Sequence, residues 1–71
     1  MFNLRKAYFI DNEIEAVAGL HNCRLLEELS LEGNCITAIE GVAHLIYLKK
    51  LDLGKNYIRK IENLGSLEYL T

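Results

Sequence analysis

A repeat of 22 residues runs through nearly the whole chain, and no other feature of the sequence constrains its fold as strongly. When the sequence is shifted by 22 positions, Leu26 aligns with Leu48 and Ile36 aligns with Ile58, without a gap or an insertion. A repeat of this length indicates tandem structural units that stack on one another. We therefore expect one repeat segment over residues 1–71, with units at 4–25, 26–47 and 48–69 and the start of a fourth at 70–71.

Two spacings of apolar residues meet within each unit. Leu29-Ser30-Leu31 alternates apolar and polar residues, which is the period of a half-buried strand. Further along the unit the apolar spacing becomes three, which suits a 3₁₀ turn or an extended return. One unit cannot bury its own leucines, so the units must stack. The sequence predicts an α/β repeat solenoid, with short parallel strands on a concave face and 3₁₀ or extended returns on a convex face.

Three asparagines occupy one column of the repeat, directly after the predicted strands. The chain turns there, which leaves backbone amide and carbonyl groups without partners. An amide side chain both donates and accepts hydrogen bonds, so it can bond its own unit and the next one. Each unsatisfied buried group costs about 1–3 kcal/mol. We therefore predict a structural ladder of Asn12, Asn34 and Asn56.

The unit pattern L-x-x-L-x-L-x-x-N-x-I-x-x-I-x-x-L-x-x-L-x-x resembles the leucine-rich repeat consensus. The segments 39–42 and 61–64 are similar to the 22-residue subclass typified by the nuclear regulatory subunit of type-1 protein phosphatase, which includes an axonemal dynein light chain. The resemblance implies a scaffold that presents its concave face to a partner protein. The alternative functions are a structural spacer in a cytoskeletal or ciliary assembly and a regulatory subunit of a protein phosphatase.

Alternate residues of the predicted strands point out from the concave face, and these are the candidate partner-binding residues. Tyrosine often carries much of the energy at protein interfaces, so Tyr8 with Ile10 could anchor a partner. The alternative is that these are ordinary solvated strand residues. Oppositely charged neighbours, Glu28 with Lys50 and Glu27 with Lys49, could form cross-strand pairs. The candidates are Lys6, Tyr8, Ile10, Glu28, Ser30, Glu32, Lys50 and Asp52, with Gly54 completing the third row.

Composition argues against several other functions. The net charge of −2 gives no basic face for nucleic acid, and no apolar run approaches the ~18 residues of a membrane span. The sequence holds no metal-ligand motif, cofactor loop or nucleophile with its base, so we expect no metal, no cofactor and no enzyme. Cys23 lies in a core column and Cys35 does not, so we expect reduced thiols and an intracellular protein, whether cytoplasmic, nuclear or axonemal.

Neither end of the sequence reads as a polar capping unit, which repeat proteins need. The sequence stops at the start of a fourth strand, and we expect Leu67, Tyr69 and Leu70 to be available to a neighbour. We expect the chain to be part of a longer repeat protein. The alternative is a short chain whose ends are covered by end-to-end self-association or by a host assembly.

Overall fold

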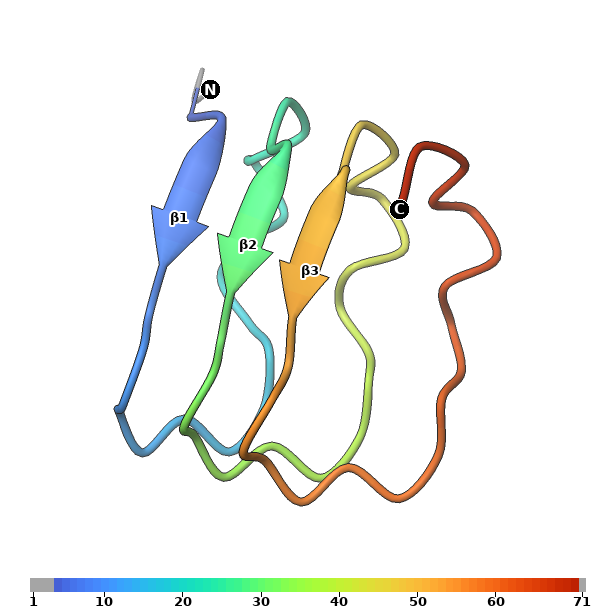
Figure 1. Ribbon diagram of the computed structural model, residues 1–71. Helices are drawn as coiled ribbons and strands as arrows, with labels where there is room; N and C mark the ends of the chain where they lie inside the picture. Colours follow the sequence, from blue (N-terminus) through green and yellow to red (C-terminus); the bar gives the residue numbers. More distant parts are fainter. Residues whose placement is uncertain (1–3, 71) are drawn as a thin grey trace.

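Three short strands form one parallel sheet in the computed structural model, which describes residues 4–70. The strands are β1 (Lys6–Tyr8), β2 (Glu28–Ser30) and β3 (Lys50–Asp52), in the order β1-β2-β3. Figure 1 shows the strands side by side, each followed by a long return, and the first two returns lead to the start of the next strand. The predicted parallel strands are therefore present. Below, residues 4–25, 26–47 and 48–69 are called the first, second and third coils.

The strands pair in the register that the 22-residue repeat requires. Ala7 pairs with Leu29, and Leu29 pairs with Leu51. These are the inward-pointing residues, and a register slip of one position would turn them to solvent. The apolar column of the repeat thus fixes the register.

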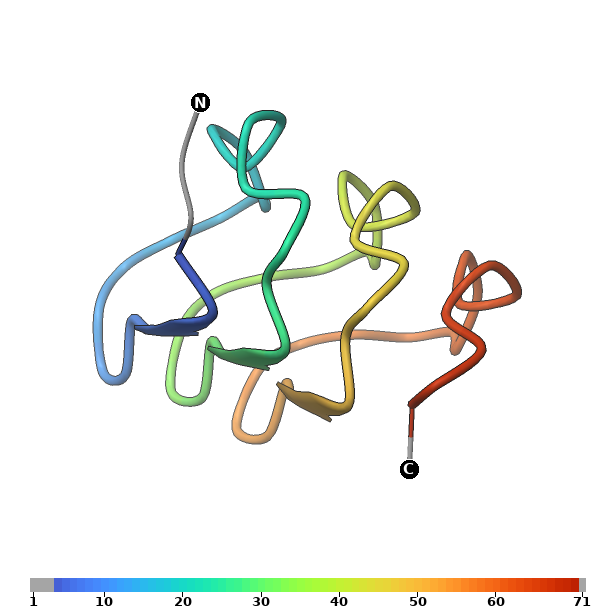
Figure 2. The same ribbon diagram turned by 90° about the horizontal axis from the view of Figure 1, so that it is seen from above.

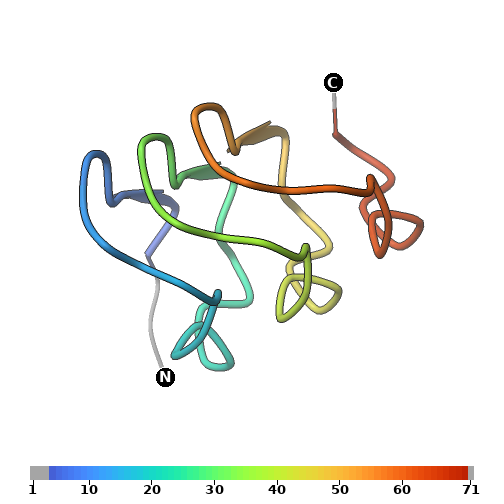
Figure 3. The same cartoon turned by 90° about the horizontal axis from the view of Figure 1, so that it is seen from below.

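Each return is extended chain that ends in two consecutive hydrogen-bonded turns, visible as the double loops in Figures 2 and 3. In the first coil, Cys23 N donates to Leu20 O at 3.0 Å, and Leu26 N donates to Cys23 O at 3.2 Å. The same pair of bonds recurs in the second and third coils. The two turns share one residue and do not overlap further, so residues 4–70 contain no 3₁₀ helix. The sequence left 3₁₀ and extended returns open; residues 4–70 show the extended form, and the apolar spacing of three produces separate turns.

The core lies between the sheet and the returns and is most complete in the second coil. Ile39 is 1% exposed, whereas Ile61 in the same column is 76% exposed. Ile61 lies outside the core because no described coil packs on the outer side of the third one. Cys23 is buried as expected, Cys35 is half-buried, and both are free thiols. The deepest core side chains are Leu26, Leu29, Ile36, Ile39, Val42, Leu45 and Leu48.

Two columns of the repeat have positive φ in every coil. One holds Asp11, Gly33 and Lys55 at φ values of 57°, 75° and 55°, directly before the asparagine. The other holds Gly19, Gly41 and Asn63 in the return. At Gly41 a Cβ atom would also lie 2.8 Å from Val17 O of the first coil. Glycine there provides both the left-handed backbone and the close approach of two coils.

Candidate functional site

The outward-pointing residues of the three strands form one surface together with the residue that lies two positions after each strand. We call this surface the strand face. Its side chains are unequally accessible: Tyr8 is 55% exposed and Ile10 is 47% exposed, whereas Ser30 is 7% exposed. Ser30 lies on the middle strand, so it contributes to the floor of the surface. The strand face consists of the predicted residues Lys6, Tyr8, Ile10, Glu28, Ser30, Glu32, Lys50 and Asp52.

A shallow, open hollow of about 540 Å³ lies in the strand face. Tyr8 and Ile10 border it from the first coil, and Lys50 and Asp52 border it from the third. Its lining also includes Glu28, Leu29, Ser30 and Leu51. Six of the eight predicted residues therefore meet around one depression, while Lys6 and Glu32 lie outside its lining.

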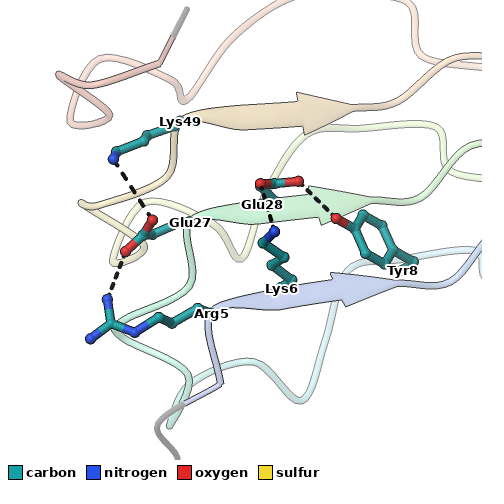
Figure 4. A network of polar contacts seen from close by, with 6 residues as sticks. All are labelled: Arg5, Lys6, Tyr8, Glu27, Glu28 and Lys49. Carbon is teal, nitrogen blue, oxygen red and sulfur yellow. Dashed lines mark hydrogen bonds and ion pairs between the residues drawn. The ribbon is translucent and has the colours of Figure 1, made fainter.

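Glu28 is the centre of the polar contacts on the strand face (Figure 4). The Tyr8 hydroxyl donates to Glu28 Oε1 at 2.7 Å, and Lys6 Nζ lies 3.6 Å from Glu28 Oε2. The hydrogen bond from Tyr8 lowers the pKa of Glu28, and the charges of Lys6 and Lys50 add to this effect. The same bond raises the pKa of Tyr8. The Tyr8–Glu28 bond is diagonal across two strands, so the column alignment did not reveal it.

A second acidic residue, Glu27, lies between two cations at the start of the strands. Arg5 Nη1 is 2.7 Å from Glu27 Oε2, and Lys49 Nζ is 3.7 Å from Glu27 Oε1 (Figure 4). The predicted Glu27–Lys49 pair is thus confirmed, and Arg5 joins it from the same column. No direct ion pair links Glu28 to Lys50 within residues 4–70, because the Glu28 carboxylate turns toward Lys6 and Tyr8.

The asparagine ladder forms in two of its three positions. Asn34 Nδ2 donates to Phe9 O at 2.8 Å and to Leu31 O at 2.7 Å, and Asn34 Oδ1 accepts from Ile14 N at 3.2 Å. Asn56 makes the equivalent bonds to the second and third coils. Each side chain therefore reaches the preceding coil, not the next one. Asn12 has no preceding coil in the described chain and bonds only Ile10 O.

Sequence reasoning missed a second row of bonds between coils, in the returns. His44 Nε2 lies 2.8 Å from Leu20 O, and Ser66 Oγ donates to Ala43 O at 2.7 Å. A carbonyl only accepts, so His44 Nε2 carries the proton. His44 and Ser66 occupy one column of the repeat, whose first member is Asn22, so a polar residue stands there in every coil, and this was the signal that the sequence offered. Both residues support the stack and lie outside the strand face.

The chemistry available on the strand face is recognition by charge, hydrogen bonding and apolar contact. Within the described residues, no group of three or more His, Cys, Asp and Glu side chains is arranged to hold a metal ion. No helix long and apolar enough to cross a membrane occurs in residues 4–70.

A family model described as leucine-rich repeats, in two copies, matches residues 24–66. A search of curated proteins finds no match to the chain. Proteins of the matched family generally serve as protein-protein interaction modules and are typically binding scaffolds without catalytic activity. The matched residues cover more than half of the sequence and include β2, β3 and the return between them. Together with the parallel strands, this match shows that the protein belongs to the leucine-rich repeat family.

Proposed function

We propose that this protein binds a partner protein through the strand face, which we take to be the concave face of the repeat. The observation that carries the proposal is the pairing of exposed Tyr8 and Ile10 with a hollow whose opposite border is charged. Exposed apolar and aromatic side chains gain most when a partner covers them.

The arrangement favours a partner that brings an apolar side chain and charges of both signs. Tyr8 and Ile10 offer an apolar border on the first coil. Across the hollow, Lys50 and Asp52 offer one cation and one anion. Glu28 is already hydrogen-bonded to Tyr8, so the tyrosine ring is held in one position before binding. A contact residue that is ordered in advance loses less conformational entropy when the complex forms.

We propose further that the protein works without a cofactor or catalytic step in an intracellular compartment. Its two free thiols, Cys23 and Cys35, support a reducing environment. Among partners, the resemblance to the phosphatase regulatory subunit makes the catalytic subunit of type-1 protein phosphatase the first to test.

A second candidate function is a spacer within a larger assembly, whose contacts come through the outer surface of the third coil. The third coil carries exposed Ile61, and its exposed Tyr69 stacks on Tyr47 of the second coil at a ring-centroid distance of 6.4 Å. Such apolar groups would be covered by a neighbouring component. The two candidate functions can be tested separately because Ile61, Tyr47 and Tyr69 are not strand-face residues.

The test compares partner capture from cell extract by the wild-type chain and three variants, followed by measurement of Kd with the purified partner. The strand-face variant is Tyr8→Ala/Glu28→Ala/Lys50→Ala, and the matched control is Tyr57→Ala/Arg59→Ala in the third return. We expect the strand-face variant to weaken binding by at least about tenfold, as loss of a hot spot does. Unchanged binding by this variant, with loss on Ile61→Ser/Tyr69→Ala, would instead establish the spacer.

A further inference from the structure

We infer that a row of apolar side chains on the turns of the returns is a docking site for a helix of a partner protein, acidic in its first turn and basic in its last. We call this row the turn ridge, and it consists of Leu25, Ile46, Tyr47 and Tyr69. Figures 2 and 3 show the double loops that carry it in one line along the stack, separated from the strands. The turn ridge shares no residue with the strand face.

The ridge residues occupy the central positions of the second turn in each return. In the second coil, Leu48 N donates to Leu45 O at 3.0 Å, which places Ile46 and Tyr47 at the corner of that turn. The residues that commonly fill such corners are Gly, Pro, Asn, Asp and Ser. A turn requires neither a β-branched nor an aromatic side chain there, so local structure does not account for this pair.

The exposure of the turn ridge does not depend on how many coils the stack has. Ile46 is 46% exposed and Tyr47 is 45% exposed, although both belong to the second coil, which has a coil on each side. In the same coil, Ile39 and Leu45 are buried. The two ridge residues therefore face solvent because of their place in the turn.

The turn ridge continues from coil to coil. The column of Tyr47 holds Leu25 in the first coil and Tyr69 in the third, so an apolar or aromatic side chain stands there in every coil. The rings of Tyr47 and Tyr69 stack at a centroid distance of 6.4 Å, with 13° between their planes. A contiguous apolar patch marks an interaction surface, whereas single exposed apolar residues are ordinary.

The spacing of the turn ridge fits a helix that lies along the stack. Residues four apart on a helix are separated by about 6 Å along its axis, close to the 6.4 Å between the rings of Tyr47 and Tyr69. Apolar residues at positions i, i+4 and i+7 would then contact three successive coils. An extended segment has a similar spacing between alternate side chains, but its main chain would lie over apolar groups without hydrogen-bond partners. A helix satisfies its own main chain, and because residues 4–70 contain none, it comes from a partner protein.

Two charged residues flank the turn ridge and select the polar residues of the helix. The column of Ile46 holds Arg24 in the first coil and Glu68 in the third. Both are exposed, and neither forms an ion pair within residues 4–70. A helix with acidic residues in its first turn and basic residues in its last is stabilised by its own dipole. Such a helix meets opposite charges when its first turn lies on the first coil and its last turn lies on the third.

The probe is a synthetic peptide of about 18 residues, long enough to form a helix in solution. It carries glutamates in its first turn, lysines in its last turn and leucines at the three contact positions. In the control peptide, glutamines replace the leucines, which keeps the charge and the helix propensity. Each peptide is titrated into the ¹⁵N-labelled 71-residue chain. We expect the leucine peptide to shift the amides of Leu25, Ile46 and Tyr47 and to bind at least about tenfold more tightly than the control peptide.

A spin label at the N-terminus of the leucine peptide tests its direction on the turn ridge. In the wild-type chain, the label should broaden the amide signals of Arg24 and Leu25 in the first coil. The double variant Arg24→Glu/Glu68→Arg keeps the net charge and reverses the two flanking charges. The label should then broaden the signals of the third coil, around Tyr69. Broadening that does not move with this exchange would overturn the inference.

Four single variants separate the turn ridge from the other surfaces. Ile46→Ser should weaken the leucine peptide about five- to tenfold, and serine is a common turn residue, so the fold is retained. Tyr57→Ser is the matched control at another exposed residue and should leave binding unchanged. Tyr8→Ala on the strand face and Ile61→Ser on the third coil should also leave it unchanged, which separates this site from both candidate functions.

Three results would contradict a helix site on the turn ridge. The first is equal binding of the leucine and control peptides. The second is a loss of peptide binding in Tyr8→Ala or Ile61→Ser that matches the loss in Ile46→Ser. The third is a dimer in sedimentation that Ile46→Ser dissociates, because a second copy of the chain would then cover the ridge.

Discussion

The second and third coils have nearly the same pattern of apolar residues, yet only the second is fully packed. Leu31 is buried and Leu53 is half-buried, although the two share a column. Ile36 and Ile58 differ in the same way. The second coil has a neighbour on each side, whereas the third has one neighbour within the described chain. Burial in a stacked repeat is therefore a property of position in the stack as much as of residue type.

The largest expected loss of unfolding free energy comes from Ile39→Ala. The matched comparison is Ile61→Ala, in the same column of the repeat. Ile39 is enclosed on both sides, so its truncation leaves a cavity and should cost about 2–5 kcal/mol. Ile61 is exposed, so its truncation should change the free energy of unfolding by less than about 0.5 kcal/mol. Urea unfolding followed by circular dichroism measures both values. Equal costs would mean that another molecule covers Ile61 in solution, and sedimentation at two concentrations would reveal it.

A smaller difference in stability is expected between Asn34→Ala and Asn12→Ala. The Asn34 side chain bonds Phe9 O, Leu31 O and Ile14 N, and its removal leaves these groups unpaired inside the stack. The cost should be about 2–3 kcal/mol. Asn12 is exposed and, within residues 4–70, its side chain bonds only Ile10 O, so its replacement should cost less than about 1 kcal/mol. Thermal unfolding of the two variants compares them directly, and a ladder role for Asn12 would be supported only if the costs were equal.

Alanine substitution at two glycines of one column distinguishes the cost of backbone strain from the cost of a clash between coils. Gly19 and Gly41 both have positive φ, so alanine is strained at either position. A Cβ atom at Gly19 meets nothing within 4 Å, whereas at Gly41 it lies 2.8 Å from Val17 O. We therefore expect Gly41→Ala to cost about 1–2 kcal/mol more than Gly19→Ala in urea unfolding. Equal costs would show that the coils separate slightly at little expense.

These comparisons also show which parts of the structure the sequence could predict. The positions of the strands and their register follow from the apolar columns, because a strand with one buried face has only one favourable register. The members of the strand face follow from the same alternation, and the hollow then brings six of them together. The subclass and the count of repeats stay predictions, since the family model matches two copies.

The features that sequence could not supply are those that depend on side-chain direction or on neighbours. The exposure of Ile61 depends on what lies beyond the third coil, which its residue type does not reveal. The bond from Tyr8 to Glu28 runs diagonally between strands and depends on the rotamers of both side chains. Ser30 is buried on the middle strand, where it pairs with Tyr8 on one side and Asp52 on the other. Each of these is a property of three-dimensional arrangement within the same repeat.

The smallest effect concerns the Tyr8–Glu28 hydrogen bond, which links the first and second coils on the strand face. Its donor is lost in Tyr8→Phe, so the pKa of Glu28 should rise toward its ordinary value, although the charges of Lys6 and Lys50 still lower it. The pH dependence follows from the two shifts. The lowered pKa of Glu28 gives a stabilisation that is present above about pH 4.5 and lost as the pH falls through the folded-state value. The raised pKa of Tyr8 gives one that is present below about pH 10 and lost as the pH rises through the folded-state value.

Stability of the wild type and of Tyr8→Phe should therefore differ most between these limits and converge in acid. An NMR titration of the Glu28 side-chain carboxyl carbon measures the shift directly, and urea unfolding at neutral and acid pH measures the convergence. Tyr57→Phe is the matched control, because Tyr57 is exposed and lies away from the strand face. An unchanged pKa of Glu28 in Tyr8→Phe would show that the hydroxyl contacts water in solution. The tyrosine ring would then be unrestrained, and it would lose more conformational entropy when a partner binds the strand face.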